Sequence, residues 1–285
     1  MTGHEGRDIV VGIDPVSDWH LPLAWAADEA QRRGLSLRLV LAVPPQHEAR
    51  RADGTPGRAA ARRAGADRLE QARRWACDRH PDASVRGDLV DGFPAPAVGA
   101  AAEGARMVVL GSRHLSRTAE VFSAGSTIVP VCAQARCPVV VVGEAEHVSG
   151  EPTCVVVGVD GAASAAAAPA FAFEEADLRG ADLRVVCVWQ PPMFILDDEE
   201  AALKAQRILL SENTAGLSGK YPDVHVTHEI VTGQPAEELA RAAEHALAVV
   251  VGRRGHGGHT GMRLGSVVHG LLRRSHCPVI IVPTD

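Results

Sequence analysis

Aromatic residues are scarce in this sequence of 285 residues, at 4%, and Tyr221 is its one tyrosine. This scarcity argues against the aromatic platforms on which some proteins stack single-stranded nucleic acids. An excess of positive charge is also missing, because the formal net charge is −6. Without a basic surface, neither a nucleic-acid partner nor binding to an acidic membrane surface is expected.

Long apolar runs are missing as well. No run approaches the roughly 18 residues that a membrane span requires. The stretch from Met1 to Asp8 is polar and charged, and it lacks the apolar core of a signal peptide. We therefore expect a cytoplasmic protein that does not associate with membranes.

The six cysteines include no Cys-x-x-Cys pair, and most of them lie within apolar runs. This pattern predicts buried free thiols rather than a disulfide framework or a zinc site. The hydrophobic content of 46% over 285 residues is enough for one large core or for two cores of ordinary domain size.

An internal repeat favours two domains. The segment Ile9–Asp14 reads as a buried strand that ends in an acid, and Cys154–Asp160 repeats it 146 residues later. The next strand, Leu37–Val43, matches Leu183–Trp189 at the same offset. The chain therefore contains two copies of one unit. We place the copies at residues 1–144 and 153–285, with a polar linker between them.

Strands alternate with helical segments in each copy. The expected helices include 58–79 and 95–103 in the first copy and 199–217 and 236–245 in the second, and the expected fifth strands are Val139–Val142 and Val279–Val282. This alternation predicts an α/β fold with open parallel sheets and helices on both faces. Because an apolar fifth strand at a sheet edge needs cover, we expect it to pair with another fifth strand, within the chain or in a homodimer.

A glycine-rich loop in the second copy has the features of a phosphate cradle. The strand Val249–Val251 ends at Gly252, and Gly255 follows three residues later. After nine further residues, Gly265 and Ser266 open an apolar periodic segment. A helix amino terminus has unpaired N–H groups and a partial positive charge, so a glycine-rich approach to it makes an anion site.

This spacing resembles the ATP-binding class of universal stress proteins. The resemblance includes Gly252-x-x-Gly255, the interval to Gly265-Ser266, the strand-final Asp160 and the run Cys277-Pro-Val-Ile-Ile-Val. It covers nearly the whole chain, in the manner of a tandem-domain member. It implies five-stranded sheets of order 3-2-1-4-5 that bind ATP or a related adenine nucleotide, with Mg left open as an accompanying ion.

The resemblance also implies the residues of the nucleotide site. It places the adenine edge against backbone at Val159 or Val188 and the ribose near Asp160. Arg253, Arg254 and Arg263 would add positive charge to the loop. His256 and His259 are spaced like weak metal ligands, but we expect them to be polar loop residues and expect no metal site. The phosphates would lie on the backbone of Gly252, Arg253, Gly255, His256, Gly265, Ser266 and Val267.

The first copy departs from this motif. His114 stands where the second glycine belongs, and the Gly-Ser pair arrives one residue late. Asp14 is followed by proline rather than glycine. We expect an impaired first site, and whether it binds nucleotide stays open. Its corresponding positions are Asp14, Gly111, Gly125 and Ser126.

Two catalytic or cofactor motifs are missing. The second-copy loop has no lysine for a Walker phosphate loop, and the segment after Asp160 lacks the glycines of a dinucleotide fingerprint. We therefore expect a nucleotide-dependent stress-response regulator with little or slow hydrolysis and an unidentified protein partner. One alternative is a hydrolysing or adenylating enzyme of the same superfamily, using Asp160 or His256. Another is an interaction module that no longer binds nucleotide.

Overall fold

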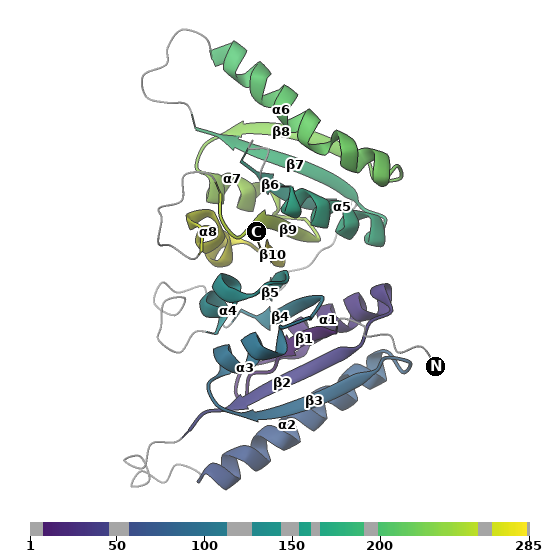
Figure 1. Ribbon diagram of the computed structural model, residues 1–285, viewed down its shortest axis with the longest axis vertical. Coiled ribbons are helices and arrows are strands. Elements are labelled where there is room, and N and C mark those ends of the chain that lie inside the picture. Colours follow the sequence, from purple (N-terminus) through teal and green to yellow (C-terminus); the bar gives the residue numbers. More distant parts are fainter. Residues whose placement is uncertain are drawn as a thin grey trace. The chain divides into compact units, whose positions relative to one another are not determined.

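The computed structural model describes residues 8–45, 57–112, 127–143, 154–160, 166–190, 199–255 and 264–283. The chain forms two compact units, Met1–Val142 and Gly143–Asp285, which we call unit 1 and unit 2. Figure 1 colours unit 1 from purple to teal and unit 2 from teal through green to yellow. Among the described residues, no helix is long and apolar enough to cross a membrane.

Unit 1 is a parallel five-stranded sheet with helices between its strands. The strand order is β3-β2-β1-β4-β5, and every neighbouring pair is parallel. The strands are β1 (Ile9–Gly12), β2 (Leu37–Val43), β3 (Val85–Asp91), β4 (Met107–Gly111) and β5 (Val139–Val142). The helices are α1 (His20–Arg33), α2 (Arg58–Arg79), α3 (Pro94–Ala101) and α4 (Ile128–Gln134).

Unit 2 repeats this topology as β8-β7-β6-β9-β10, again with parallel neighbours. The predicted α/β class and strand order are therefore confirmed. The strands are β6 (Cys154–Val159), β7 (Asp182–Trp189), β8 (Val226–Thr232), β9 (Ala248–Gly252) and β10 (Val279–Val282). The helices are α5 (Ala167–Arg179), α6 (Glu199–Lys220), α7 (Pro235–Ala242) and α8 (Ser266–Arg274).

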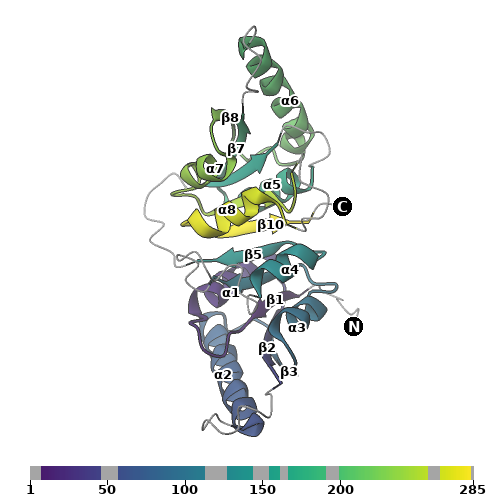
Figure 2. The ribbon, with the colours of Figure 1, turned by 90° about the vertical axis from the view of Figure 1, so that its left-hand side faces the viewer.

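The helices of unit 2 cover both faces of its sheet. Helix α5 packs on β6, β9 and β10 and touches α6, whereas α7 packs on β6 and β7 and touches α8. Figure 2 shows these two pairs of helices with the strands between them. Helix α6 continues to Lys220, three residues beyond the predicted end, because the proline that stops it is Pro222.

The apolar strands form the core of each unit. Val155–Val157 of β6 and Val249–Val250 of β9 are completely buried, as are Phe173 and Ala172 of α5 above them. Parallel strands buried on both faces need continuous apolar runs rather than alternation, and β-branched valine suits both the pleat and the burial.

All six cysteines are free in the described part of the chain. Cys77 and Cys154 are half-buried, and the other four are buried, as predicted. Burial raises the pKa of the Cys132 thiol to about 12 and that of Cys277 to about 11. A raised pKa lowers the thiolate fraction, so these buried thiols are chemically inert in the folded protein.

We expect a thiol-specific disulfide reagent at mildly alkaline pH to label Cys77 and Cys154 first in the native protein. The four buried thiols react only on unfolding, because they are both inaccessible and protonated. Labelling followed by mass spectrometry checks the order, and all six thiols should react in concentrated guanidinium chloride. Rapid labelling of Cys132 or Cys277 in the native protein would contradict the burial.

Candidate functional site

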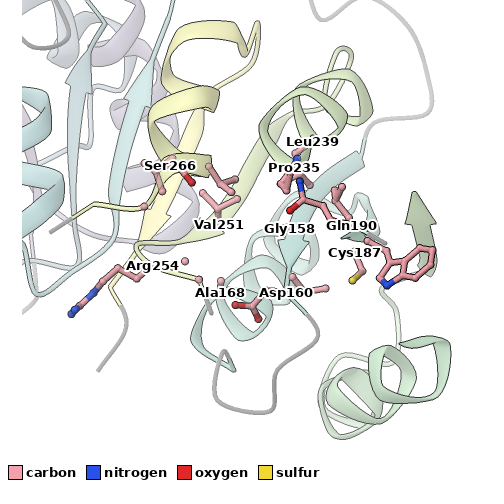
Figure 3. A pocket seen from close by; sticks show the side chains of 18 of the residues that line it. Gly158, Asp160, Ala168, Cys187, Gln190, Pro235, Leu239, Val251, Arg254 and Ser266 are labelled. Carbon is pink, nitrogen blue, oxygen red and sulfur yellow. The ribbon is translucent and has the colours of Figure 1, made fainter. Parts of the chain in front are cut away.

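Unit 2 has a cavity of about 460 Å³ at the carboxyl ends of β6, β7 and β9. Strand β6 pairs with β7 on one side and with β9 on the other, so the connections change direction there. Ligands of open parallel sheets bind outside the carboxyl ends of the strands at such a point. Figure 3 shows Arg254 and Ser266 at one end of the cavity and Cys187 and Gln190 at the other.

The two ends of the cavity are lined by different residues. The glycine end consists of Gly252, Arg254 and Gly255 together with residues 264–267. The β7 end consists of Val159, residues 187–190 and Gln206 of α6. Gly158 lies in the floor between them (Figure 3). A Cβ atom at Gly158 would lie 2.7 Å from Leu239 Cδ1 and 3.1 Å from Val251 Cγ1, so only glycine allows α7 to pack this closely on the strand.

Backbone hydrogen bonds hold the glycine end in place. The Arg253 N–H donates to Val282 O at 2.7 Å, and the Gly265 N–H donates to Arg253 O at 3.0 Å. Gly265 is the N-cap of α8, and its carbonyl accepts the bond from His269 N. This is the first hydrogen bond of the helix. Ser266 and Val267 come before His269 in the first turn, where helical N–H groups have no intrahelical acceptor.

The glycine end therefore offers two kinds of positive potential. One is the first turn of α8, where the helix dipole adds to the N–H groups of Ser266 and Val267. The other is the guanidinium group of Arg254, which belongs to the lining and lies near Arg253. Burial, and then the charge of Arg254, lowers the pKa of Arg253 from its usual value. The helix terminus and Arg254 together make this end suited to a negatively charged ligand.

Asp160 stands at the end of β6, between the two ends of the cavity (Figure 3). A Cβ atom at Gly255 would lie 3.3 Å from Asp160 Oδ2, so the carboxylate lies close to this glycine. Burial, and then the charge of Asp160, raises the pKa of the Cys187 thiol. Asp160 thus provides a negative, hydrogen-bond-accepting group midway along the cavity, where a neutral hydroxyl-bearing group can bind.

The β7 end has a mixed apolar and amide lining. Val159 and Val188 contribute apolar surface, and Trp189, Gln190 and Gln206 contribute an indole and two carboxamides. These last three residues were not predicted, because a single tryptophan or glutamine has no motif around it. The one signal available in the sequence was the position of Trp189 and Gln190 directly at the end of a predicted strand.

The structure brings most of the predicted second-copy positions together. Arg253 is absent from the described lining, whereas Arg254, expected only to add charge, belongs to it. His256 and His259 lie outside the described residues. Because the amides of Arg253 and Gly265 bond within the protein, Ser266 and Val267 are the better backbone donors. The predicted residues that line the cavity are Val159, Asp160, Val188, Gly252, Gly255, Gly265, Ser266 and Val267.

Unit 1 differs at the corresponding positions. The Asp14 carboxylate accepts hydrogen bonds from Val16 N at 2.8 Å and Ser17 N at 2.9 Å, so it caps its own turn. A Cβ atom at Gly111 would lie 3.2 Å from Pro22 Cγ, because the Pro22 ring occupies the place that Ala168 has in unit 2. Gly125 and Ser126 lie outside the described residues.

The universal stress protein family model matches residues 6–143 and again residues 153–283. The chain belongs to the universal stress protein family. A universal stress protein of Mycobacterium tuberculosis is 32% identical to this chain over an alignment 297 positions long, which covers 96% of each of the two chains. Since the family model matches it twice, the chain of 285 residues has two universal stress protein domains in tandem.

A solved structure of low sequence identity shares the fold of this chain. The crystal structure of a universal stress protein from Archaeoglobus fulgidus has a TM-score of 0.69 at 18% identity, covers 97% of this chain and 96% of its own, and shows the same fold. Another solved universal stress protein is a complex with cAMP; it is 27% identical, spans 48% of this chain and 100% of its own, and has a TM-score of 0.36. Within the described residues of this universal stress protein, no group of three or more His, Cys, Asp or Glu side chains could hold a metal ion.

Proposed function

We propose that the unit 2 cavity binds ATP or a related adenine nucleotide, and that the protein acts as a nucleotide-dependent regulator in a stress response. One observation carries this proposal: the glycine end of the cavity includes the first turn of α8, with the amides of Ser266 and Val267 in its lining. Helix amino termini approached by glycines favour phosphate. The cavity of about 460 Å³ also falls within the roughly 300–1,000 Å³ typical of small-molecule sites.

The three parts of a nucleotide match three parts of the cavity. The phosphates lie at the glycine end, where α8 and Arg254 offset their charge. The ribose hydroxyls donate to Asp160. The base lies at the β7 end, near the backbone of Val159 and Val188. If Mg accompanies ATP, the phosphates supply its ligands, together with water.

The same lining gives little support for fast hydrolysis or adenylation. Asp160 is the one carboxylate among the described lining residues, and no histidine or lysine accompanies it there. Fast phosphoryl or acyl transfer needs a positioned base or a metal site beside the phosphates. The enzyme alternative rests on Asp160 among the described residues and on His256, which lies outside them. Turnover that disappears in Asp160→Asn would favour that alternative over the regulatory proposal.

We further propose that unit 1 is impaired. Its Asp14 carboxylate is engaged in a turn, and the Pro22 ring lies against Gly111. Arg68 strengthens this arrangement, because its guanidinium donates to Asp14 O at 2.7 Å and also to Ser17 O. Rebuilding that segment to admit a nucleotide would break these bonds.

We expect one adenine nucleotide to bind per chain. Native mass spectrometry of freshly purified protein gives the ligand mass, and titration calorimetry with ATP gives the stoichiometry. Asp14→Asn should leave the affinity for ATP unchanged, whereas Asp160→Asn should weaken it several-fold by removing an acceptor for the ribose. An absence of binding at millimolar ATP would refute the proposal, and two equal sites would refute the impairment of unit 1.

The pairing of the apolar fifth strands also stays a proposal. Strands β5 and β10 each stand last in the strand order of their own unit. An unpaired apolar edge favours association, so we propose that each pairs with another fifth strand, within the chain or in a homodimer. The same native mass spectrum gives the oligomeric state.

A further inference from the structure

Helices α2 and α6 occupy the same place in the two units but differ at their eighth residue. Each helix has 22 residues, and the twelfth, Leu69 in α2 and Leu210 in α6, is buried in both. The eighth residue is Gly65 in α2 and Gln206 in α6. At equivalent positions, unit 1 therefore has the smallest residue and unit 2 has a long amide side chain.

In unit 1, Gly65 lets the helix lie directly on β2. A Cβ atom there would lie 3.0 Å from Leu41 Cδ2 and 3.5 Å from Val43 Cγ2. Val43 is the last residue of β2 and is buried. A longer side chain at position 65 would therefore displace its neighbours at the end of this strand.

In unit 2, the equivalent positions carry large side chains that border the cavity. Trp189 is the last residue of β7, in the place of Val43, and it is half-buried. Gln206 is also half-buried, and both residues line the cavity together with the exposed Gln190. The β7 end therefore has an aromatic ring and two amides where unit 1 has aliphatic packing.

We propose that Trp189, Gln190 and Gln206 determine base specificity at this site, with a preference for purines over pyrimidines. This inference rests on the proposed nucleotide binding and adds that side chains, and not backbone alone, read the base. The indole provides a stacking surface, and a two-ring purine covers more of it than a one-ring pyrimidine. A carboxamide has a donor beside an acceptor, which matches the edge of adenine, where an amino group adjoins a ring nitrogen.

The test measures ATP and CTP binding to the full chain and to its variants by calorimetry. The native protein should bind ATP at least about tenfold more tightly than CTP. Trp189→Leu should weaken ATP binding about tenfold and CTP binding much less, so that the preference shrinks towards unity. Gln206→Ala should weaken ATP binding about fivefold through the loss of amide hydrogen bonds.

Ile208→Ala is the matched control. Ile208 lies two residues from Gln206 in α6, is 50% exposed and is not part of the cavity lining, so this variant should bind both nucleotides as the native protein does. Retained CTP affinity in Trp189→Leu and Gln206→Ala shows that these variants are folded, and circular dichroism checks the same point.

The outcomes separate this inference from the proposed function. If the native protein binds neither nucleotide, the proposed function fails and the inference fails with it. If the native protein binds ATP and CTP equally, the inference alone is overturned. The inference is also overturned if the preference for ATP is unchanged in both variants, because the base is then read by backbone.

Discussion

Replacing Gly265 by aspartate is expected to weaken ATP binding at least about 100-fold, a loss of roughly 2.7 kcal/mol. Gly265 is the N-cap of α8, so the new carboxylate would lie at the first turn of the helix, where we place the phosphates. It would repel the nucleotide and compete for the amides of Ser266 and Val267. Titration calorimetry with ATP measures the loss.

The fold should survive this substitution. Aspartate is among the best N-cap residues, and the φ of −69° at Gly265 suits any amino acid. Gly265→Asn is the control, because asparagine has the same shape and also caps helices but has no charge. Either side chain must fit a Cβ position 3.3 Å from Arg253 O, so the asparagine variant measures the steric cost by itself. Equal losses in the two variants would contradict an anion site.

Phe173→Ala is expected to destabilise unit 2 by about 3–5 kcal/mol. Phe173 is completely buried in α5, and its ring stacks on that of Tyr221 at 5.9 Å between centroids. Truncation removes apolar burial and leaves a cavity that the closely packed neighbours fill only in part. For a unit of this size the melting temperature should fall by roughly 10 °C, as measured by calorimetry or circular dichroism.

The matched control for this prediction is again Ile208→Ala. Ile208 belongs to the same unit but is half-exposed, so its truncation should change the free energy of unfolding by less than about 1 kcal/mol. Phe173→Leu keeps most of the apolar volume and should fall between the two. A loss below about 1 kcal/mol for Phe173→Ala would mean that α5 repacks against the sheet.

The main elements of the fold were predictable because their signals are local. The strand at Ile9 and its repeat at Cys154 are short runs of β-branched residues, and the matching offsets of later strands show the duplication directly. The strand order came from the resemblance to universal stress proteins, and the pairing of β6 with both β7 and β9 confirms it for unit 2. Crossover connections leave few other arrangements for such alternating elements.

The candidate site was predictable only in part. The spacing of Gly252, Gly255 and Gly265 is visible in the sequence, because a phosphate loop needs glycine at set intervals. The sequence does not show the hydrogen bond from Gly265 N to Arg253 O. Because this bond occupies the Gly265 amide, Ser266 and Val267 are the better donors to a ligand. The sequence also does not show that the Asp14 carboxylate caps its own turn, because the direction of this side chain depends on the fold around it.

By itself, the sequence determined the duplication, the α/β class and the position of the glycine-rich loop, since each depends on residues close together in the chain. The tertiary structure alone decided which side chains share the cavity. Trp189 and Gln206 come from different elements and line one cavity, and the closeness of Gly65 to Leu41 depends on how a helix packs on a strand. Proximity across elements depends on packing, and packing depends on the whole core at once.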